Sequence, residues 1–177
     1  MPSSKPLLTH LRTNALTALK ALCFIHFFRE YAFDIRSTYG PSMLPTISVQ
    51  SDRILIAKPF RRGRGITTGD IVSIRHPLLP SEGAVKRVVG MGGDFVLRDT
   101  PASLDTPHSS LDSGTMMIQV PEGHCWLIGD NVEASRDSRF YGPVPLAMVK
   151  GKVVARIKPW GRVEWVENSL TGRVDGG

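Results

Sequence analysis

The chain has 177 residues, a size typical of one domain. Its 17 glycines and 13 prolines disfavour a bundle of long helices and favour strands joined by turns. A hydrophobic content of 41% with 21% charged residues excludes wholesale disorder. Two cysteines cannot form a disulfide framework or a cysteine-based zinc site. The net charge of +6 permits a nucleic-acid or anionic membrane partner and requires neither.

The N-terminal segment is apolar and contains no acidic residue before Glu30. Its most apolar part, residues 15–28, would span about 21 Å as a helix, whereas the hydrocarbon core of a bilayer is about 30 Å thick. An extension to residue 33 crosses the charged pair Arg29 and Glu30. Three interpretations stay open: a membrane anchor, a mitochondrial-type targeting segment, and an amphipathic helix docked on the domain. We expect residues 1–36 to form this N-terminal helical unit.

From residue 37 onward the sequence changes to short apolar runs separated by Gly, Pro and Asp. No helical period of the usual length lies between these runs, which argues against a parallel α/β sheet. We therefore predict a mainly β domain over residues 37–166, an antiparallel barrel or sandwich, followed by a flexible tail over 167–177. The predicted strands cover residues 51–58, 70–75, 84–90, 95–98, 116–120, 124–128 and 151–157. The predicted loops include a basic segment at 59–68 and an exposed insertion at 100–114.

A serine lies in a rigid stretch of chain, Tyr39-Gly-Pro-Ser-Met-Leu-Pro-Thr46. Prolines on both sides of Ser42 fix backbone φ angles and favour a turn that can present the hydroxyl to a cleft. An ordinary serine turn explains the same pattern. A nucleophilic serine also needs a base, and none of the five histidines stands in a suggestive arrangement with an acid. Ser42 is therefore a candidate nucleophile that requires a base of another kind.

Lys86 is the candidate base. Strand alternation places Lys86 on one face with Ala84 and Val88, and places Arg87 on the opposite face. If the first face is buried, desolvation lowers the pKa of Lys86 and leaves a neutral amine that can accept a proton from a serine hydroxyl. The alternative is an outward-facing lysine on a half-buried strand. The burial of this face decides between the two.

The segment from Gly129 to Pro145 is a long loop rich in hydroxyl, carboxylate and guanidinium groups. Asp137 and Arg139 can pair and brace the loop, and Ser135 is a short hydrogen-bonding residue that can orient a neighbouring amine. A polar turn explains the start of this segment but not the whole of it. The composition of the loop therefore indicates supporting groups for an active site.

These segments together resemble the type I signal peptidases, membrane-bound proteases with a serine–lysine dyad. Within that family the chain is most similar to the catalytic subunits of the mitochondrial inner membrane protease, subunit 1 in particular. The resemblance is carried by residues 40–46, 69–72, 86–94, 129–145 and 148–152, in the family's order and spacing. It implies an antiparallel β catalytic domain with a single N-terminal helix as its membrane anchor.

The resemblance also implies a role for each candidate residue. Ser42 matches the nucleophile, and Lys86 matches the general base. Ser135 matches the serine that orients the lysine, while Asp137 and Arg139 match a supporting pair. The family's reaction needs no metal and no cofactor.

The resemblance further implies oxyanion donors and a mode of substrate binding. The backbone N–H of Ser42 is the expected oxyanion donor, and Gly40 stands where the best-known bacterial members have a hydroxyl residue as second donor. Substrates of this family are extended and pair with exposed strand edges beside the nucleophile. The residues expected to bind substrate here are Tyr39, Met43, Gly83, Ala84 and Val85.

The same resemblance implies a location in the cell and binding partners. We expect the inner mitochondrial membrane, with the catalytic domain facing the intermembrane space, and a heterodimer with a paralogous protease subunit. The expected substrates are precursor polypeptides with N-terminal sorting signals, and no nucleic acid is expected. Arg87 and the basic loop at 59–68 would then meet acidic substrate residues or lipid headgroups, or would be solvated surface charge.

Three alternatives remain beside this interpretation. The first is a bacterial-type leader peptidase of the plasma membrane. The second is a self-cleaving repressor with the same dyad, for which residues 1–36 are too short and too apolar to hold a helix-turn-helix. The third is a non-catalytic, membrane-tethered β domain that acts as an assembly subunit. The presence of Ser42, Lys86 and Ser135 together argues against the third.

Overall fold

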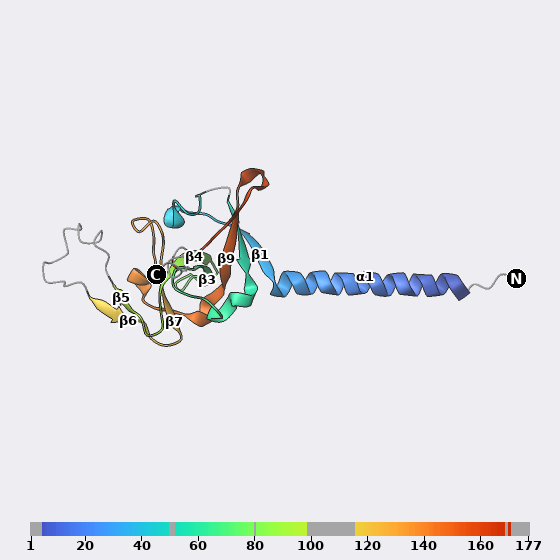
Figure 1. Cartoon of the computed structure of the whole chain (residues 1–177), viewed down its shortest axis with the longest axis horizontal. Helices are drawn as coiled ribbons and strands as arrows, with labels where there is room; N and C mark the ends of the chain where they lie inside the picture. The colour runs from blue at the N-terminus through green and yellow to red at the C-terminus, as the bar shows by residue number, and fades with distance from the viewer. Residues whose placement is uncertain (1–4, 50–51, 80, 99–115, 169, 171–177) are drawn as a thin grey trace, which may run out of the picture.

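The computed structural model describes residues 5–49, 52–79, 81–98, 116–168 and 170, which form one long helix and a β domain (Figure 1). The predicted insertion at 100–114 and most of the predicted tail lie outside the described residues. The elements in chain order are α1 (Lys5–Tyr31), β1 (Phe33–Ser37), the 3₁₀ turn η1 (Pro41–Met43), β2 (Arg53–Ala57), η2 (Lys58–Gly63), β3 (Ile71–Arg75), β4 (Gly83–Met91), β5 (Phe95–Leu97), β6 (Met117–Gln119), β7 (His124–Ile128), α2 (Ser138–Tyr141), β8 (Val144–Pro145), η4 (Leu146–Met148), β9 (Val149–Ile157), η5 (Pro159–Gly161) and β10 (Val163–Trp165).

The main sheet has eight strands, with β1-β2-β9-β3-β4-β7-β8 as its path and β10 paired to β9. All its strand pairs are antiparallel, and β5 and β6 form a separate antiparallel pair. Each predicted strand is present within two residues of its expected bounds. The prediction of a mainly antiparallel β domain with one N-terminal helix is therefore confirmed.

The first strand begins inside the segment that the sequence assigned to the N-terminal helix. Helix α1 ends at Tyr31, and β1 starts at Phe33 and pairs with β2 from Phe33 opposite Ala57 to Ser37 opposite Arg53. Cross-strand pairing satisfies the backbone N–H and C=O groups of these residues without a helix. The helical segment therefore stops short of the predicted limits at residues 33 and 36.

Helix α1 extends away from the sheet, as Figure 1 shows. Its described side chains over residues 12–28 are exposed, for example Leu22 at 65% and Phe24 at 68%. An amphipathic helix docked on the domain would bury one face, so that alternative is wrong. Among the described residues, no helix has both the length and the apolar content needed to cross a membrane.

Apolar clusters on the sheet hold the loops that carry the candidate site. One cluster joins η1 to the sheet, because Met43 and Ile47 are 3% and 2% exposed and pack with four buried strand residues, Ile54, Ile56, Ile71 and Val153. Burial of each such side chain stabilises the fold by about 1.5–3 kcal/mol. A second cluster joins β3, β4, β7 and β9 and includes Val88, which shares a strand face with Lys86. The turn that carries Ser42 and the strand that carries Lys86 are thus both packed on the buried core.

Candidate active site

The turn that carries Ser42 is held by its own backbone and by its neighbours. Gly40 has a φ of 96°, a left-handed value that glycine adopts without steric penalty. Pro41 then begins the 3₁₀ turn η1, and the N–H of Leu44 donates to the carbonyl of Pro41 at 3.2 Å. Met43, the next residue after Ser42, points into the core. Ser42 itself is half-buried and lines a groove, as a reactive serine at a cleft requires.

The backbone of Ser42 also contacts the loop that begins at Gly129. The N–H of Asn131 donates to the carbonyl of Ser42 at 3.0 Å. A Cβ at Gly129 would collide with the carbonyl oxygen of Ser42 and with Ser135 Oγ, so a glycine is required for this close approach. The predicted nucleophile and the predicted orienting serine therefore both lie against Gly129.

Lys86 lies on the buried face of β4. It is 4% exposed, and it stands opposite Val72 of β3, which is fully buried. Within the described ranges Lys86 forms no ion pair and no hydrogen bond. Burial lowers the pKa of Lys86, the field of Asp137 opposes this shift, and the field of Arg139 adds to it. The inward-facing interpretation of Lys86 is thus confirmed, and the outward-facing one is wrong.

Asp137 and Arg139 form the pair that the sequence predicts, and the pair is buried. Arg139 Nε and Asp137 Oδ1 are 2.8 Å apart, with side chains 7% and 0% exposed. Asp137 Oδ2 also accepts from the N–H of Gly129 at 3.1 Å, and Arg139 donates to the carbonyl of Val132 at 2.7 Å. The pair therefore ties the two ends of the loop together. Its hydrogen bonds hold the pKa of Asp137 below the ordinary value despite burial.

The side chain of Ser135 is buried in the loop that begins at Gly129. Its side chain is 4% exposed, and its Oγ has no hydrogen-bond partner of normal geometry among the described residues. It still lies close enough to Asp137 to lower the pKa of that carboxyl group. A buried hydroxyl without a partner loses free energy relative to one that is satisfied. Ser135 thus lies beside Gly129 and Asp137 with a buried hydroxyl that is free of a normal hydrogen bond within the described ranges.

The buried pair gives a prediction for stability. Replacing Asp137 by alanine leaves the Arg139 guanidinium buried without its carboxylate, and we expect a loss of about 3–5 kcal/mol. The matched control is Asp34→Ala, which breaks the exposed pair of Asp34 and Arg36, whose side chains are 30% and 64% exposed. That change should cost less than about 1 kcal/mol. Urea unfolding of both variants measures the difference, and equal losses would contradict the assigned role of Asp137.

A network that sequence reasoning missed joins the loop of Ser42 to β4 and β9. The Thr46 hydroxyl donates to Asp130, and Asp130 accepts from both Arg87 Nε and Arg87 Nη2, at 2.8 and 2.7 Å. Arg87 also donates to the carbonyl of Gly69 at 2.8 Å. At the other end of Thr46, its carbonyl accepts from Arg156. Thr46 is therefore fixed at both its hydroxyl and its carbonyl.

This network corrects the expectation for Arg87. The sequence offered it as a contact for acidic substrate residues, for lipid headgroups or for solvent, but its guanidinium is engaged with Asp130 in a two-point pair. Bidentate pairs of this kind fix both position and orientation. Arg87 thus positions the loop beside its neighbour Lys86. The one available signal was the acid Asp130 in the polar run that begins at Gly129.

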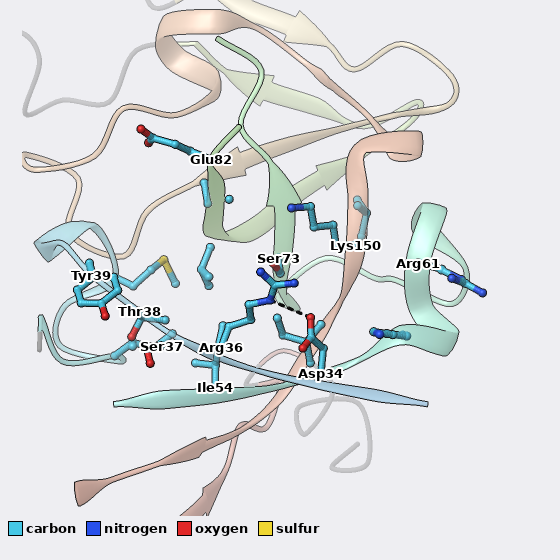
Figure 2. A pocket seen from close by; sticks show the side chains of 18 of the residues that line it. Asp34, Arg36, Ser37, Thr38, Tyr39, Ile54, Arg61, Ser73, Glu82 and Lys150 are labelled. Atoms are coloured by element: carbon cyan, nitrogen blue, oxygen red, sulfur yellow. Dashed lines mark hydrogen bonds and ion pairs between the residues drawn. The ribbon is translucent and has the colours of Figure 1, made fainter. Parts of the chain in front are cut away.

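The groove beside Ser42 has a volume of about 880 Å³ and lies between β1 and the start of β4. Figure 2 shows Tyr39 and Arg61 on opposite sides of it, with Ser73 and Lys150 between them. Every residue that the sequence offers for substrate binding lines this groove. These residues are Tyr39, which is 84% exposed, Met43, Gly83, Ala84 and Val85.

The start of β4 is a free strand edge. Strand β3 covers one side of β4 from Gly83 to Arg87, whereas pairing with β7 on the other side begins only at Arg87. Among the described residues, the backbone of 83–86 therefore lacks a sheet partner on the β7 side. An unpaired edge of this kind accepts an extended peptide as an added strand. At the far end of the sheet path, β1 supplies the second wall of the groove.

The structure brings the predicted site residues into one region. The turn η1 with Ser42 packs against β4, which carries Lys86, and the loop after Gly129 contacts both. In the part of the chain that is described, no three His, Cys, Asp or Glu side chains are placed to hold a metal ion. The arrangement puts a serine hydroxyl and a buried amine on elements that pack together, and these are the group types that nucleophilic catalysis with a lysine base requires.

Comparison with known proteins gives relatives over most of the chain. Mitochondrial inner membrane protease subunit 1 of Saccharomyces cerevisiae is 42% identical over 169 residues, which cover 86% of this chain and 88% of that protein. The protein of the same name from Homo sapiens is 38% identical over 150 residues, covering 85% and 84%. Mitochondrial inner membrane protease subunit 2 of Danio rerio is 33% identical over 130 residues, covering 73% and 64%.

A model of one protein family also matches most of the chain. The model described as signal peptidase, peptidase S26, matches residues 11–104 and 97–160. A crystal structure of a signal peptidase I from Enterococcus faecalis has a TM-score of 0.38 at 22% identity, covering 50% of this chain and 96% of that chain. The family match and the relatives confirm the predicted resemblance, and with it a protease of the mitochondrial inner membrane. The chain belongs to the signal peptidase family, peptidase S26.

Proposed function

We propose that the chain is a catalytic subunit that removes N-terminal sorting peptides from precursor proteins, with Ser42 as nucleophile and Lys86 as general base. The observation that carries this proposal is the state of Lys86. Its amine is buried on the inner face of β4, has no anionic partner in direct contact among the described residues, and has a lowered pKa. A lysine of this kind is neutral in a larger fraction of molecules than an exposed lysine, and only the neutral amine accepts a proton.

In the proposed first step, Ser42 Oγ attacks the carbonyl carbon of the scissile bond while Lys86 takes the hydroxyl proton. The resulting oxyanion accepts from the backbone N–H of Ser42, and Gly40 can add only its own N–H because it has no side chain. Collapse of the tetrahedral intermediate breaks the C–N bond, and the Lys86 ammonium returns the proton to the leaving amine. The sorting peptide then remains as an ester on Ser42.

The second step hydrolyses this ester. Lys86, neutral again, takes a proton from a water molecule that attacks the ester carbonyl, and the Ser42 oxygen leaves with the proton from Lys86. Throughout the cycle the Ser135 hydroxyl is available to orient the amine, and Asp137 with Arg139 keeps the loop in place. The Arg87–Asp130–Thr46 network supports the nucleophile from the other side.

The groove supports an extended precursor as substrate. The free edge at 83–86 can pair with the residues before the cut, and the small Gly83 and Ala84 allow close approach of a peptide backbone. We further propose that the domain faces the intermembrane space and that the chain works as a heterodimer with a paralogous protease subunit. The names of the relatives, which distinguish a subunit 1 and a subunit 2, support a complex of several subunits.

The dependence of cleavage on pH tests the proposal. Below the lowered pKa of Lys86 the amine is protonated and cannot accept a proton, so kcat/KM should fall about tenfold for each pH unit. Above that pKa the amine is neutral and kcat/KM should reach a plateau. Because burial lowers the pKa, the boundary lies closer to neutral pH than for an exposed lysine. Precursor cleavage is measured from acidic to alkaline pH. A kcat/KM that stays constant as the pH falls would exclude a lysine base.

A further inference from the structure

The exposed side chains of α1 require an environment that the domain does not supply. Leu22, Phe24, Ile25 and Phe27 are 65%, 68%, 53% and 60% exposed. Successive helical residues advance by about 100°, so these four point to different sides of the helix. A helix that is apolar on all sides fits an apolar surrounding better than a groove, which would cover one face. The part of α1 from Leu22 to Phe27 thus presents exposed apolar side chains on several sides of the helix.

A basic segment lies against the end of this helix. Residues 58–69 contain four basic and no acidic residues, namely Lys58, Arg61, Arg62 and Arg64. Lys58 Nζ donates to the carbonyl of Glu30 at 3.1 Å, and the N–H of Lys58 donates to the carbonyl of Ala32 at 2.9 Å. The guanidinium of Arg61 stacks on the ring of Tyr31, 5.2 Å from its centre. The segment is therefore attached to the last turn of α1.

Three arginines of this segment, Arg61, Arg62 and Arg64, form what we call the basic collar. None of them makes an ion pair among the residues that the structure describes. Arg62 and Arg64 are exposed, and Arg62 has a φ of 60°, which L-residues other than Asn and Asp rarely adopt. In Figure 2 the Arg61 side chain extends from η2 at the edge of the groove. The acids nearest in sequence are Asp52 and Asp70, and Asp70 is paired with Lys152.

We propose that the basic collar binds the anionic headgroups of phospholipids while the apolar surface of α1 lies among acyl chains. Cations at the end of an apolar helix meet the headgroup layer, where each contributes favourably in proportion to the negative surface charge. Tyrosine is also favoured in the headgroup layer. The ring of Tyr31, on which Arg61 stacks, would lie in that layer. The charge of the collar favours this occupant over a neutral apolar partner surface.

The contact has a consequence for the groove. Lys58, Arg61 and Arg62 also line the groove, and Figure 2 shows Arg61 at the end away from Tyr39. A collar bound to headgroups therefore holds that end of the groove at the membrane surface. The lipid contact itself does not depend on the proposed cleavage reaction, and its test requires no substrate.

Binding of the full chain to vesicles tests this proposal. The probes are phosphatidylcholine vesicles without and with phosphatidylglycerol, and flotation gives the partition coefficient. Each basic residue near an anionic surface contributes about fivefold in affinity. The variant Arg62→Gln/Arg64→Gln should therefore bind the anionic vesicles about 25- to 30-fold more weakly than the unchanged chain. Binding to the neutral vesicles should be unaltered, and high salt should remove most of the difference.

A control variant removes the same charge elsewhere. Arg53 stands opposite Ser37, at the end of the β1–β2 pair away from α1, and Arg98 follows β5, on the far side of the domain (Figure 1). Arg53→Gln/Arg98→Gln should bind anionic vesicles within a few-fold of the unchanged chain. An equal loss in both variants would mean that only net charge matters and would overturn the proposal. Equal binding of the unchanged chain to neutral and anionic vesicles would overturn it too.

Discussion

Replacing Ser42 by alanine is expected to lower kcat for precursor cleavage by a factor on the order of 10⁶, because no other group can form the acyl intermediate. Fold and stability should be kept, since the side chain of Ser42 is half-buried and the turn depends on Gly40, Pro41 and Met43. Cleavage of a purified precursor, followed by gel and by mass of the products, measures the loss.

A matched control for Ser42 lies in the same loop. Ser48 is half-buried and its backbone N–H donates to Asp52 at 3.1 Å, so Ser48→Ala keeps that bond and should keep normal cleavage. If Ser42→Ala cleaved the precursor at the normal rate, the chain would use another nucleophile, and if the unchanged chain did not cleave it, the chain would be a non-catalytic subunit. Either result would remove the proposed mechanism.

Replacing Lys86 by methionine is the second large effect that we expect. Methionine preserves the length and apolar stem of the side chain but cannot take the proton in either step, so kcat should fall about 10⁴-fold. Lys86→Arg should be equally inactive, because a guanidinium remains protonated at every working pH.

Lys86→Met should also be more stable than the unchanged chain. Burial lowers the pKa of Lys86, so the unfolded state takes up a proton more readily than the folded state as pH falls below the ordinary lysine value. That difference destabilises the folded chain at neutral pH, and methionine removes it. The melting temperature should rise by about 2–4 °C for each kcal/mol regained. Loss of activity together with a lower melting temperature would instead indicate a structural lysine.

The strands of the fold were predictable because apolar alternation and turn residues mark them directly. The alternation around Lys86 was sufficient to group its side chain with Ala84 and Val88 and apart from Arg87, but the burial of that face of β4 is known only from the structure. Strand β1 was missed because Phe33 continues the apolar composition of the helix, and only pairing with β2 turns it into a strand. Strand β10 was missed because its three residues are too few to show a period and it depends on its contact with β9.

The site was predictable where its partners are close in sequence. Asp137 and Arg139 are two residues apart, so their pairing could be read from the loop itself. The contacts of Thr46 could not, since Asp130 is 84 residues away and Arg156 is 110 residues away. Such contacts depend on which strands become neighbours, and side-chain types alone do not encode that. The sequence thus indicated the reacting groups better than the network that positions them.

The central claim, that Ser42 attacks the substrate with Lys86 as its base, is tested most directly by trapping the acyl intermediate. The full chain is mixed with precursor, quenched in acid within the first turnovers, digested and analysed by mass spectrometry. The account predicts the sorting peptide joined as an ester to Ser42 in the unchanged chain, and no adduct in Lys86→Met. An adduct on another residue, or an adduct on Ser42 that forms equally fast in Lys86→Met, would contradict it.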